Sequence, residues 1–136
     1  MKAVFADAQY WIALLNRHDG LHDAAKKASA ARGAAPLMTS EMVLAEVLDF
    51  FSERGEQARS AAASLVRRLL SDSKITVVPQ TSSQFSEALA LYAERKDKHW
   101  SLTDCASFCI MQKAGLTEAL THDLHFEQAG FKALLR

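Results

Sequence analysis

The sequence predicts an α/β fold in which helices cover both faces of a mostly parallel sheet. Segments with the pattern of strands alternate with segments of helical periodicity along the chain, as in parallel-sheet proteins. The 136 residues suit one domain, residues 1–136, with a sizeable core. Only 5 glycines and 2 prolines occur, so long linkers and disordered tails are not expected.

The first half of the chain contains the pattern of two short strands and four helices. Residues 2–7 form an apolar strand that ends in an acid, and residues 8–19 carry apolar side chains at helical spacing. An alanine-rich helix follows and should stop at Gly33. Thr39 or Ser40 then caps a strongly apolar helix. The predicted elements are strands at 2–7 and 35–40 and helices at 8–19, 20–33, 39–55 and 56–73.

The second half repeats this alternation. Residues 74–80, "KITVVPQ", are rich in β-branched side chains and closed by a proline, which makes them the clearest strand. A capped helix over 81–97 comes next, and another helix begins near Ser101 and stops near Gly115. The predicted end of the chain has strands at 117–123 and 131–135, the second at a sheet edge, with a turn or short helix at 124–130 between them.

Charge and hydropathy exclude several classes of protein. Sixteen Lys and Arg residues balance sixteen Asp and Glu residues, whereas proteins that coat nucleic acid by bulk charge are usually strongly basic. No segment approaches the roughly 20 apolar residues that span a membrane, and Asp7 interrupts the first apolar run too early for a signal peptide. Cys105 and Cys109, one helical turn apart, suit a disulfide poorly. We therefore expect a cytoplasmic protein with reduced cysteines.

Four acids occupy positions where parallel sheets form their binding sites, at strand ends and in the loops that follow. Asp7 and Asp123 end predicted strands. Asp104 opens a helix, and Glu46 lies within the apolar stretch "MVLAEVLDFF". Brought together without basic partners, these carboxylates would repel one another, and a divalent cation would remove that conflict. Oxygen ligands select Mg²⁺ or Mn²⁺, which can activate water for displacement at phosphorus. The pattern indicates phosphodiester hydrolysis.

Each acid also has a purely structural interpretation. Asp7 could cap the helix that follows it, and Asp104 could complete a capping box with Ser101. Glu46 could lie at the solvated border of its helix, and Asp123 could be an ordinary turn residue. These alternatives remain open from the residues alone.

The chain resembles the PIN-domain family. The specific stretches are "SLTDCASFCIMQKAG" at 101–115 and "ALTHDLHFEQAGF" at 119–131. The stretches "VFADAQYWIALLNRHDGLHDAA" and "TSEMVLAEVLDF" extend the likeness over nearly the whole chain. Within this family the chain is similar to the VapC-type toxins of bacterial toxin–antitoxin pairs.

This resemblance implies a three-layer α/β/α sandwich, a homodimer, and endoribonuclease activity on RNA that a partner antitoxin restrains. It also implies that one or two Mg²⁺ or Mn²⁺ ions bind to the acids. Asp7 and Asp104 would be the most dependable ligands, and Asp123 and Glu46 would complete the cluster directly or through water. Thr103 would help to orient Asp104.

Gln9 departs from the family's pattern. Two residues after the first Asp the family often has Ser, Thr or Asn, whereas this chain has the longer amide of Gln9. Contacts in the shell around the metal are therefore expected to differ at this point. The departure removes none of the acids.

A zinc site is the sharpest competing interpretation. Cys105, Cys109, His122 and His125 nearly reproduce the spacing of a two-Cys, two-His finger. That motif places more residues between its histidines than the two found here, and both cysteines lie in a predicted helix. We therefore expect His125 to pack or to form a hydrogen bond beside Phe126, rather than to bind zinc.

The segment "ERKDKHW" at 94–100 places Arg95 and Lys98 beside Trp100, next to the predicted site. Such side chains contact phosphates and stack on bases, so Arg95 and Lys98 are candidate RNA-binding residues. A solvated helix end, with Asp97 in its exposed turn, explains the same pattern.

Two other functions fit these residues. A non-catalytic module could keep the fold to bind RNA or a partner, although such a module does not need four clustered carboxylates. A DNA nuclease or an RNA-processing enzyme without a toxin role would use the same chemistry. The single domain, without an appended module, favours the toxin.

Overall fold

The structure, a computed structural model, describes residues 3–136 and contains one parallel sheet. Its strands run in the order β3-β2-β1-β4-β5, and every neighbouring pair is parallel. The strands are β1 (Val4–Ala6), β2 (Leu37–Ser40), β3 (Ile75–Val78), β4 (Glu118–Leu120) and β5 (Lys132–Ala133). The chain adds β2 and β3 on one side of β1 and then β4 and β5 on the other. The order therefore reverses between β1 and β4.

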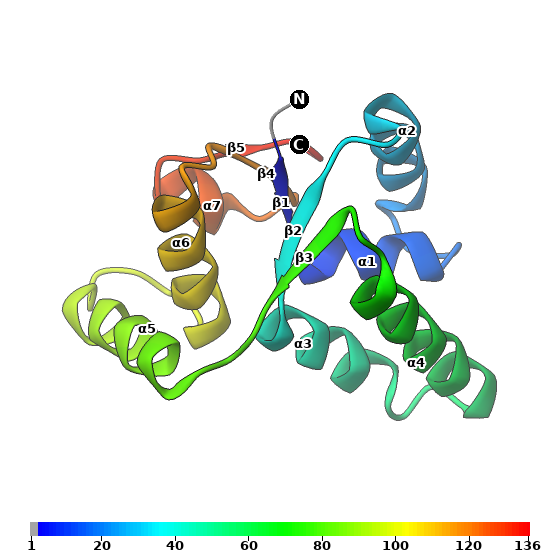
Figure 1. Cartoon of the computed structure of the whole chain (residues 1–136), viewed down its shortest axis with the longest axis horizontal. Coiled ribbons are helices and arrows are strands. Elements are labelled where there is room, and N and C mark those ends of the chain that lie inside the picture. The colour runs from blue at the N-terminus through cyan, green and yellow to red at the C-terminus, as the bar shows by residue number, and fades with distance from the viewer. Residues whose placement is uncertain (1–2) are drawn as a thin grey trace.

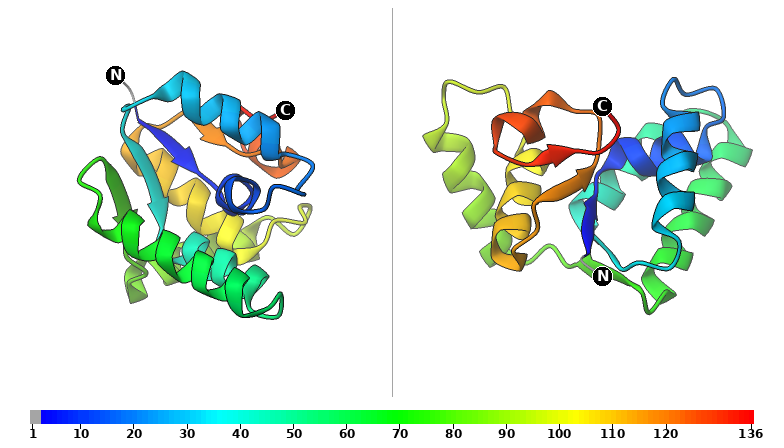
Figure 2. Two further views of the ribbon diagram at one scale, coloured as in Figure 1. Left: turned by 90° about the vertical axis from the view of Figure 1, so that its right-hand side faces the viewer. Right: turned by 90° about the horizontal axis from the view of Figure 1, so that it is seen from above.

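Helices cover both faces of this sheet, as the sequence predicts. Figure 1 shows α5, α6 and α7 on one side and α1, α2 and α4 on the other, with α3 across the end at which β2 finishes. The two further views of Figure 2 show the same layers. The helices are α1 (Ala8–Leu15), α2 (His22–Arg32), α3 (Glu41–Phe51), α4 (Glu56–Ser71), α5 (Ser82–Glu94), α6 (Leu102–Ala114) and α7 (Leu124–Gln128).

The helix ends follow the local chemistry of the sequence. The Ser40 hydroxyl accepts a hydrogen bond from the Val43 N–H at 3.1 Å, which makes Ser40 the cap of α3. The predicted helix at 39–55 starts later than expected because Thr39 and Ser40 belong to β2. Gly115 ends α6 with φ of 69°, a left-handed conformation that glycine adopts without strain.

The core lies on both faces of the central strand. All three residues of β1 are buried, as expected for a parallel strand covered by helices on both sides. On one face, Trp100, Phe108 and Phe126 form a chain of edge-to-face ring contacts, with centroids 4.9 and 5.0 Å apart. These contacts join α6 to α7 and hold the first turn of α7 against the sheet layer.

Two further expectations concern thiols and membranes. Cys105 is buried, Cys109 is half-buried, and both are free thiols, as predicted. Burial raises the pKa of the Cys105 thiol to about 11. Within residues 3–136, no helix is both long enough and apolar enough to cross a membrane. Residue 2, the start of the predicted first strand, lies outside the described residues.

Candidate active site

The candidate site lies where the strand order reverses. Asp7 directly follows β1, and Asp123 comes shortly after β4, the strand across the reversal. The backbone N–H of Asp7 donates to the carbonyl oxygen of Leu120 at 3.3 Å, so the two strand ends remain paired up to the site. In open parallel sheets, ligands bind beyond the carboxyl ends of the strands at such a reversal.

Asp7 is buried and only 4% exposed, although it carries a carboxylate. It occupies the N-cap position of α1, but its side chain forms no cap hydrogen bond, so the capping interpretation is wrong. Instead Thr121 donates its hydroxyl hydrogen to Asp7 Oδ2 at 2.9 Å. Burial, together with the negative charges of Glu46 and Asp104, raises the pKa of Asp7 to about 7, although hydrogen bonds from Ala8 and Thr121 oppose the rise.

Asp104 completes the capping box considered from the sequence and also contacts a second polar side chain. Its backbone N–H donates to the Ser101 hydroxyl at 3.0 Å, and its Oδ2 accepts from the Ser101 N–H at 3.1 Å, which completes a capping box. The same Oδ2 lies 2.9 Å from His125 Nδ1. Burial raises the pKa of Asp104, while the hydrogen bonds from Ser101 and His125 oppose this rise. The cap therefore fixes the position of an acid in the site.

Glu46 and Asp123 complete the group from two other elements. Glu46 projects from α3 with an exposed side chain, yet partial burial and then the charges of Asp104 and Asp123 raise its pKa. Asp123 caps α7, because its Oδ1 accepts from the His125 N–H at 2.9 Å. The interpretations of Glu46 as a border residue of its helix and of Asp123 as a turn residue thus describe where each lies locally. The fold, in addition, brings both acids toward Asp104.

The donor set suits a hard divalent cation. Candidate ligand atoms of Asp104, Asp123 and His125 all lie within 4.8 Å of one another. Within residues 3–136, the ion pairs of the four predicted acids involve His125 alone, and none involves Lys or Arg. Burial and neighbouring carboxylates raise the pKa values of Asp7, Glu46 and Asp104, and acids gathered without Lys or Arg favour binding of Mg²⁺ or Mn²⁺.

Thr121 is a contact of the acids that the sequence did not predict, whereas the expectation that His125 forms a hydrogen bond is confirmed by its contact with Asp104. The buried Thr121 hydroxyl accepts from the Asp123 N–H at 3.1 Å while it donates to Asp7, so it joins two acids of the group. Gln9, the departure from the family pattern, accepts from the His122 N–H at 2.9 Å through its side-chain oxygen. In the sequence, the polar residues on either side of Asp123 in "LTHDLHF" were the feature from which these contacts could have been predicted.

The zinc interpretation is not matched by the arrangement of the cysteines. The group of possible ligand atoms that the described residues bring together contains His125 but neither cysteine. Cys109 instead lines a hollow with Glu87 and Lys113, on the side of α6 that faces α5.

The predicted RNA-binding residues lie in the loop before α6. Arg95 donates two hydrogen bonds of 3.0 Å to Asp97, whose pKa falls to about 2, and Lys98 lies 3.8 Å from the same carboxylate. Contacts from Arg95 and Lys98 to phosphate stay predictions. Trp100 is only 6% exposed and donates to Gln128 at 3.0 Å, so the expectation that it stacks on bases is wrong.

Thr103, the residue predicted to orient Asp104, lies in the first turn of α6. Its carbonyl oxygen accepts from the Ser107 hydroxyl at 2.9 Å. The hydrogen bonds that position the Asp104 carboxylate come from Ser101 and His125. Orientation of Asp104 by Thr103 therefore stays a prediction.

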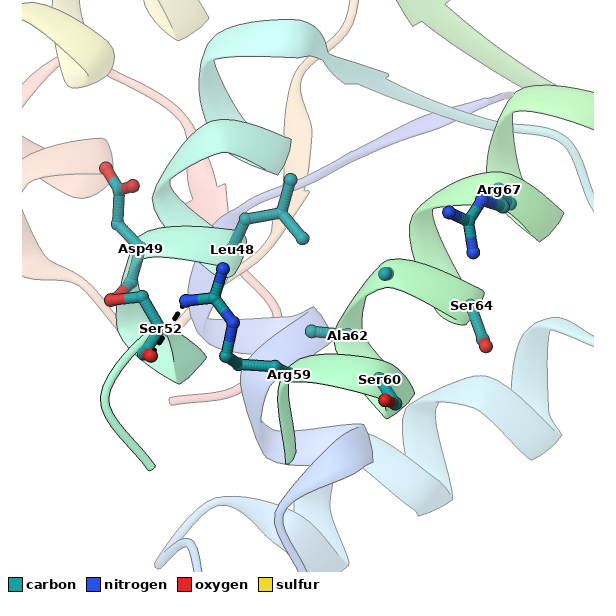
Figure 3. Close-up of a pocket in the computed structure, with 9 residues that line it drawn as sticks. Leu48, Asp49, Ser52, Arg59, Ser60, Ala62, Ser64 and Arg67 are labelled. Atoms are coloured by element: carbon teal, nitrogen blue, oxygen red, sulfur yellow. Dashed lines mark hydrogen bonds between the residues drawn. The ribbon is translucent and has the colours of Figure 1, made fainter. Parts of the chain in front are cut away.

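A separate hollow of about 670 Å³ lies between α3 and α4. Figure 3 shows Arg59 near Leu48, Asp49 and Ser52, with Arg67 further along α4. Arg59 donates to the Ser52 carbonyl oxygen at 2.8 Å. The hollow contains one carboxylate and two arginines, so it lacks the grouped acids that would bind a divalent cation for hydrolysis at phosphorus. The group of acids is therefore the better candidate for the site of phosphodiester hydrolysis.

The fold and the acid group define a class of protein. The chain belongs to the PIN domain family, whose model matches residues 4–132. It is 33% identical over 130 residues to the 23S rRNA-specific endonuclease VapC20 of Mycobacterium tuberculosis, a match that covers 94% of this chain and 95% of the relative. The crystal structure of that VapC20, described as a sarcin–ricin loop cleaving toxin, matches with a TM-score of 0.83 at 30% identity, covering 94% of this chain and 95% of VapC20. The predicted family and fold class are thus confirmed.

Proposed function

We propose that this chain is a VapC-type toxin, a metal-dependent endoribonuclease that hydrolyses RNA phosphodiester bonds. The observation that carries the proposal is the group of Asp7, Glu46, Asp104 and Asp123 at the reversal of strand order. Glu46, Asp104 and Asp123 each raise the pKa of at least one other acid of the group, and within the described residues none of the four is paired with Lys or Arg. Likeness to VapC20 over nearly the full length of both chains supports the same function.

The four acids would hold one or two Mg²⁺ or Mn²⁺ ions. A bound divalent cation supplies charge that stabilises the transition state at phosphorus and favours ionisation of water. Thr121 keeps Asp7 in place, and the capping box keeps Asp104 in place, so both carboxylates are preorganised before the ion arrives. Such preorganisation lowers the cost of assembling the site.

Hydrolysis adds water to phosphorus and breaks the bond to the leaving sugar oxygen. Glu46 is the exposed acid of the four, and its raised pKa makes it the best acceptor for a proton from the attacking water. Asp7 is too deeply buried for that role, because Thr121 and the end of β1 enclose it. We therefore assign proton transfer to Glu46, which would contact the ions through water, and direct ion binding to the other three acids.

The sarcin–ricin loop of 23S rRNA is the first substrate to test. The relative VapC20 is described as cleaving that loop. Arg95 and Lys98, which precede the first turn of α6, are candidates to contact phosphates beside the cleaved bond. A cognate antitoxin would restrain the activity, and the reaction would take place in the cytoplasm, where both free thiols stay reduced.

We also propose a homodimer that forms through α5. Three large apolar side chains of this helix are exposed at helical spacing: Phe85, Leu89 and Tyr92. The other exposed residues of α5 are Ser82, Ser83, Ser86, Ala90, Ala93 and Glu94, so the only charge among them lies at the C-terminal end of the helix. A two-fold contact places the same surface on both partners, and an uncharged apolar surface meets its own copy without repulsion.

The test of the nuclease function uses an RNA hairpin that carries the sarcin–ricin loop sequence. We expect wild-type protein to cleave it with Mn²⁺ or Mg²⁺ and not with EDTA. Asp104→Asn keeps the size of the side chain and removes its charge, so cleavage should fall by about 100-fold or more while the circular dichroism spectrum is unchanged. Cleavage is followed by gel electrophoresis of end-labelled RNA.

Asp49→Asn is the matched control. Asp49 lies on α3, one turn beyond Glu46, and lines the hollow between α3 and α4. This variant should cleave at nearly the wild-type rate. Metal-independent cleavage, or full activity of folded Asp104→Asn, would contradict the proposal. RNA binding without any cleavage would favour the non-catalytic module instead.

A further inference from the structure

One histidine contacts two acids of the candidate site. His125 Nδ1 lies 2.9 Å from Asp104 Oδ2 and 3.4 Å from Asp123 Oδ1. Both neighbours are carboxylate oxygens, which accept hydrogen bonds when ionised, so Nδ1 must carry the hydrogen. Either the neutral imidazole protonated at Nδ1 or the imidazolium ion provides that N–H. The contact therefore does not depend on a change of protonation.

The hydrogen bonds around His125 divide each carboxylate into a held oxygen and a free one. Asp104 Oδ2 accepts from both the His125 ring and the Ser101 N–H. Asp123 Oδ1 accepts from the backbone N–H of His125 at 2.9 Å. Within residues 3–136, Asp104 Oδ1 and Asp123 Oδ2 form no hydrogen bond, so one oxygen of each acid remains to ligate an ion.

The backbone beside His125 is anchored in the core. Phe126 is fully buried, and its ring packs edge-to-face on Phe108 of α6 at 5.0 Å. The Phe131 N–H donates to the Phe126 carbonyl oxygen at 3.0 Å. The imidazole is consequently carried by a rigid part of the protein, which allows it to set the positions of the two carboxylates.

On this geometry, and on the premise that the proposed function is correct, we propose that His125 is a positioning residue. Its Nδ1–H and its backbone N–H hold Asp104 and Asp123 close together, with candidate ligand atoms within 4.8 Å of one another. Nδ1 of His125 does not ligate the ion, because it carries the hydrogen that it donates to the carboxylates. Partners of this kind, which orient the ligands, typically change metal affinity by about 10- to 100-fold when they are removed.

The experiment compares two substitutions at this position. His125→Leu keeps the apolar volume and removes the donor, whereas His125→Asn keeps an N–H close to the place of Nδ1. We expect His125→Leu to weaken Mn²⁺ binding, measured by calorimetry with the metal alone, by about 10-fold or more. The kcat for RNA cleavage should fall as well, while KM for RNA changes little. His125→Asn should recover most of both losses.

His22→Leu serves as the matched control. His22 Nδ1 also makes a hydrogen bond, to the Ala13 carbonyl oxygen at 2.6 Å, but it lies between α1 and α2, away from the acids. Loss of that contact should lower the melting temperature without a change in Mn²⁺ affinity. His125→Ala gives a second variant without the donor, so the comparison does not depend on the folding of His125→Leu alone.

Three results would distinguish an error in the role of His125 from an error in the proposed function. Folded His125→Leu or His125→Ala with unchanged Mn²⁺ affinity and kcat would overturn the positioning role. Pulsed electron paramagnetic resonance that detects nitrogen bonded directly to Mn²⁺ would also overturn it, because His125 would then be a ligand. Wild-type protein that binds no Mn²⁺ and cleaves RNA in EDTA would instead refute the proposed function itself.

Discussion

Single side chains in this protein serve both a local structure and the candidate site. Asp104 completes the capping box of α6 and also presents a carboxylate beside Asp123 and His125. Asp123 caps α7 in the same way. A cap fixes the rotamer of an acid through backbone N–H groups, so the acid needs no separate support. The structural and functional interpretations of these residues are therefore compatible.

Asp7 should make the stability of the metal-free protein depend on pH. Its pKa is about 7 in the folded protein and near 3.8 when the chain unfolds. Between these values the folded state binds a proton that the unfolded state lacks, so stability falls as the pH rises from about 4 to about 7. The shift corresponds to a loss of up to about 4 kcal/mol. Raised pKa values of Glu46 and Asp104 act in the same direction.

Urea unfolding in EDTA at pH 5 and pH 8 measures this effect. Asp7→Asn cannot ionise, so its unfolding free energy should fall much less between these two pH values than that of the wild-type protein. Asp97 does not interfere, because its pKa of about 2 lies below this range. The same loss of stability in wild-type protein and Asp7→Asn would show that Asp7 is not the source.

At the scale of elements, helix caps explain where the chain stops and starts. Ser101 caps α6 and Thr81 caps α5 by the same contact, from the third residue's N–H to the hydroxyl, at 3.0 and 3.1 Å. Only the first of these caps adjoins the candidate site. Substitutions of Ser101 and Thr81 can therefore be compared to separate the contribution of a cap to stability from its contribution to function.

Ser101→Ala and Thr81→Ala should each lower the free energy of unfolding by about 1 kcal/mol. Ser101→Ala should in addition weaken Mn²⁺ binding, because the first turn of α6 positions the Asp104 carboxylate. Chemical denaturation and calorimetry with Mn²⁺ measure the two effects. Equal Mn²⁺ affinities for both variants would mean that the cap of α6 contributes to stability alone.

The elements themselves were largely predictable from sequence. Apolar spacing, caps and glycines are local signals, and they predicted every strand and helix of the described chain within a few residues. The errors occur where two elements compete for the same residues. Thr39 and Ser40 extend β2 because they pair with Val77 and Val78 of β3, a contact that the local sequence does not contain.

At the scale of the whole molecule, the exposed stripe on α5 predicts the oligomeric state. Leu89→Glu would place a negative charge at the centre of the proposed two-fold contact, so both copies would carry it. Light scattering coupled to size-exclusion chromatography should then report a monomer, whereas the wild-type protein is a dimer. Leu70→Glu, which alters an exposed apolar residue of α4, should leave the dimer intact. A wild-type monomer, or a dimeric Leu89→Glu variant, would contradict the proposed contact.

The sequence by itself determined the class of this protein. Alternating strands and helices predicted the parallel sheet, and the acids at strand and helix ends, with the resemblance of "SLTD" and "THDLHFEQAGF", predicted the PIN fold. These signals can be recognised in the sequence because each depends on residues within about two turns of a helix or within one strand.

The tertiary structure decided how the acids are held. Thr121 lies 114 residues from Asp7 in the chain, and His125 lies 21 residues from Asp104, yet each forms a hydrogen bond with that acid. The burial of Trp100 against Phe108 likewise depends on where α6 packs. Such contacts depend on how strands and helices far apart in the chain pack together. No local pattern of residues specifies which distant segments come into contact.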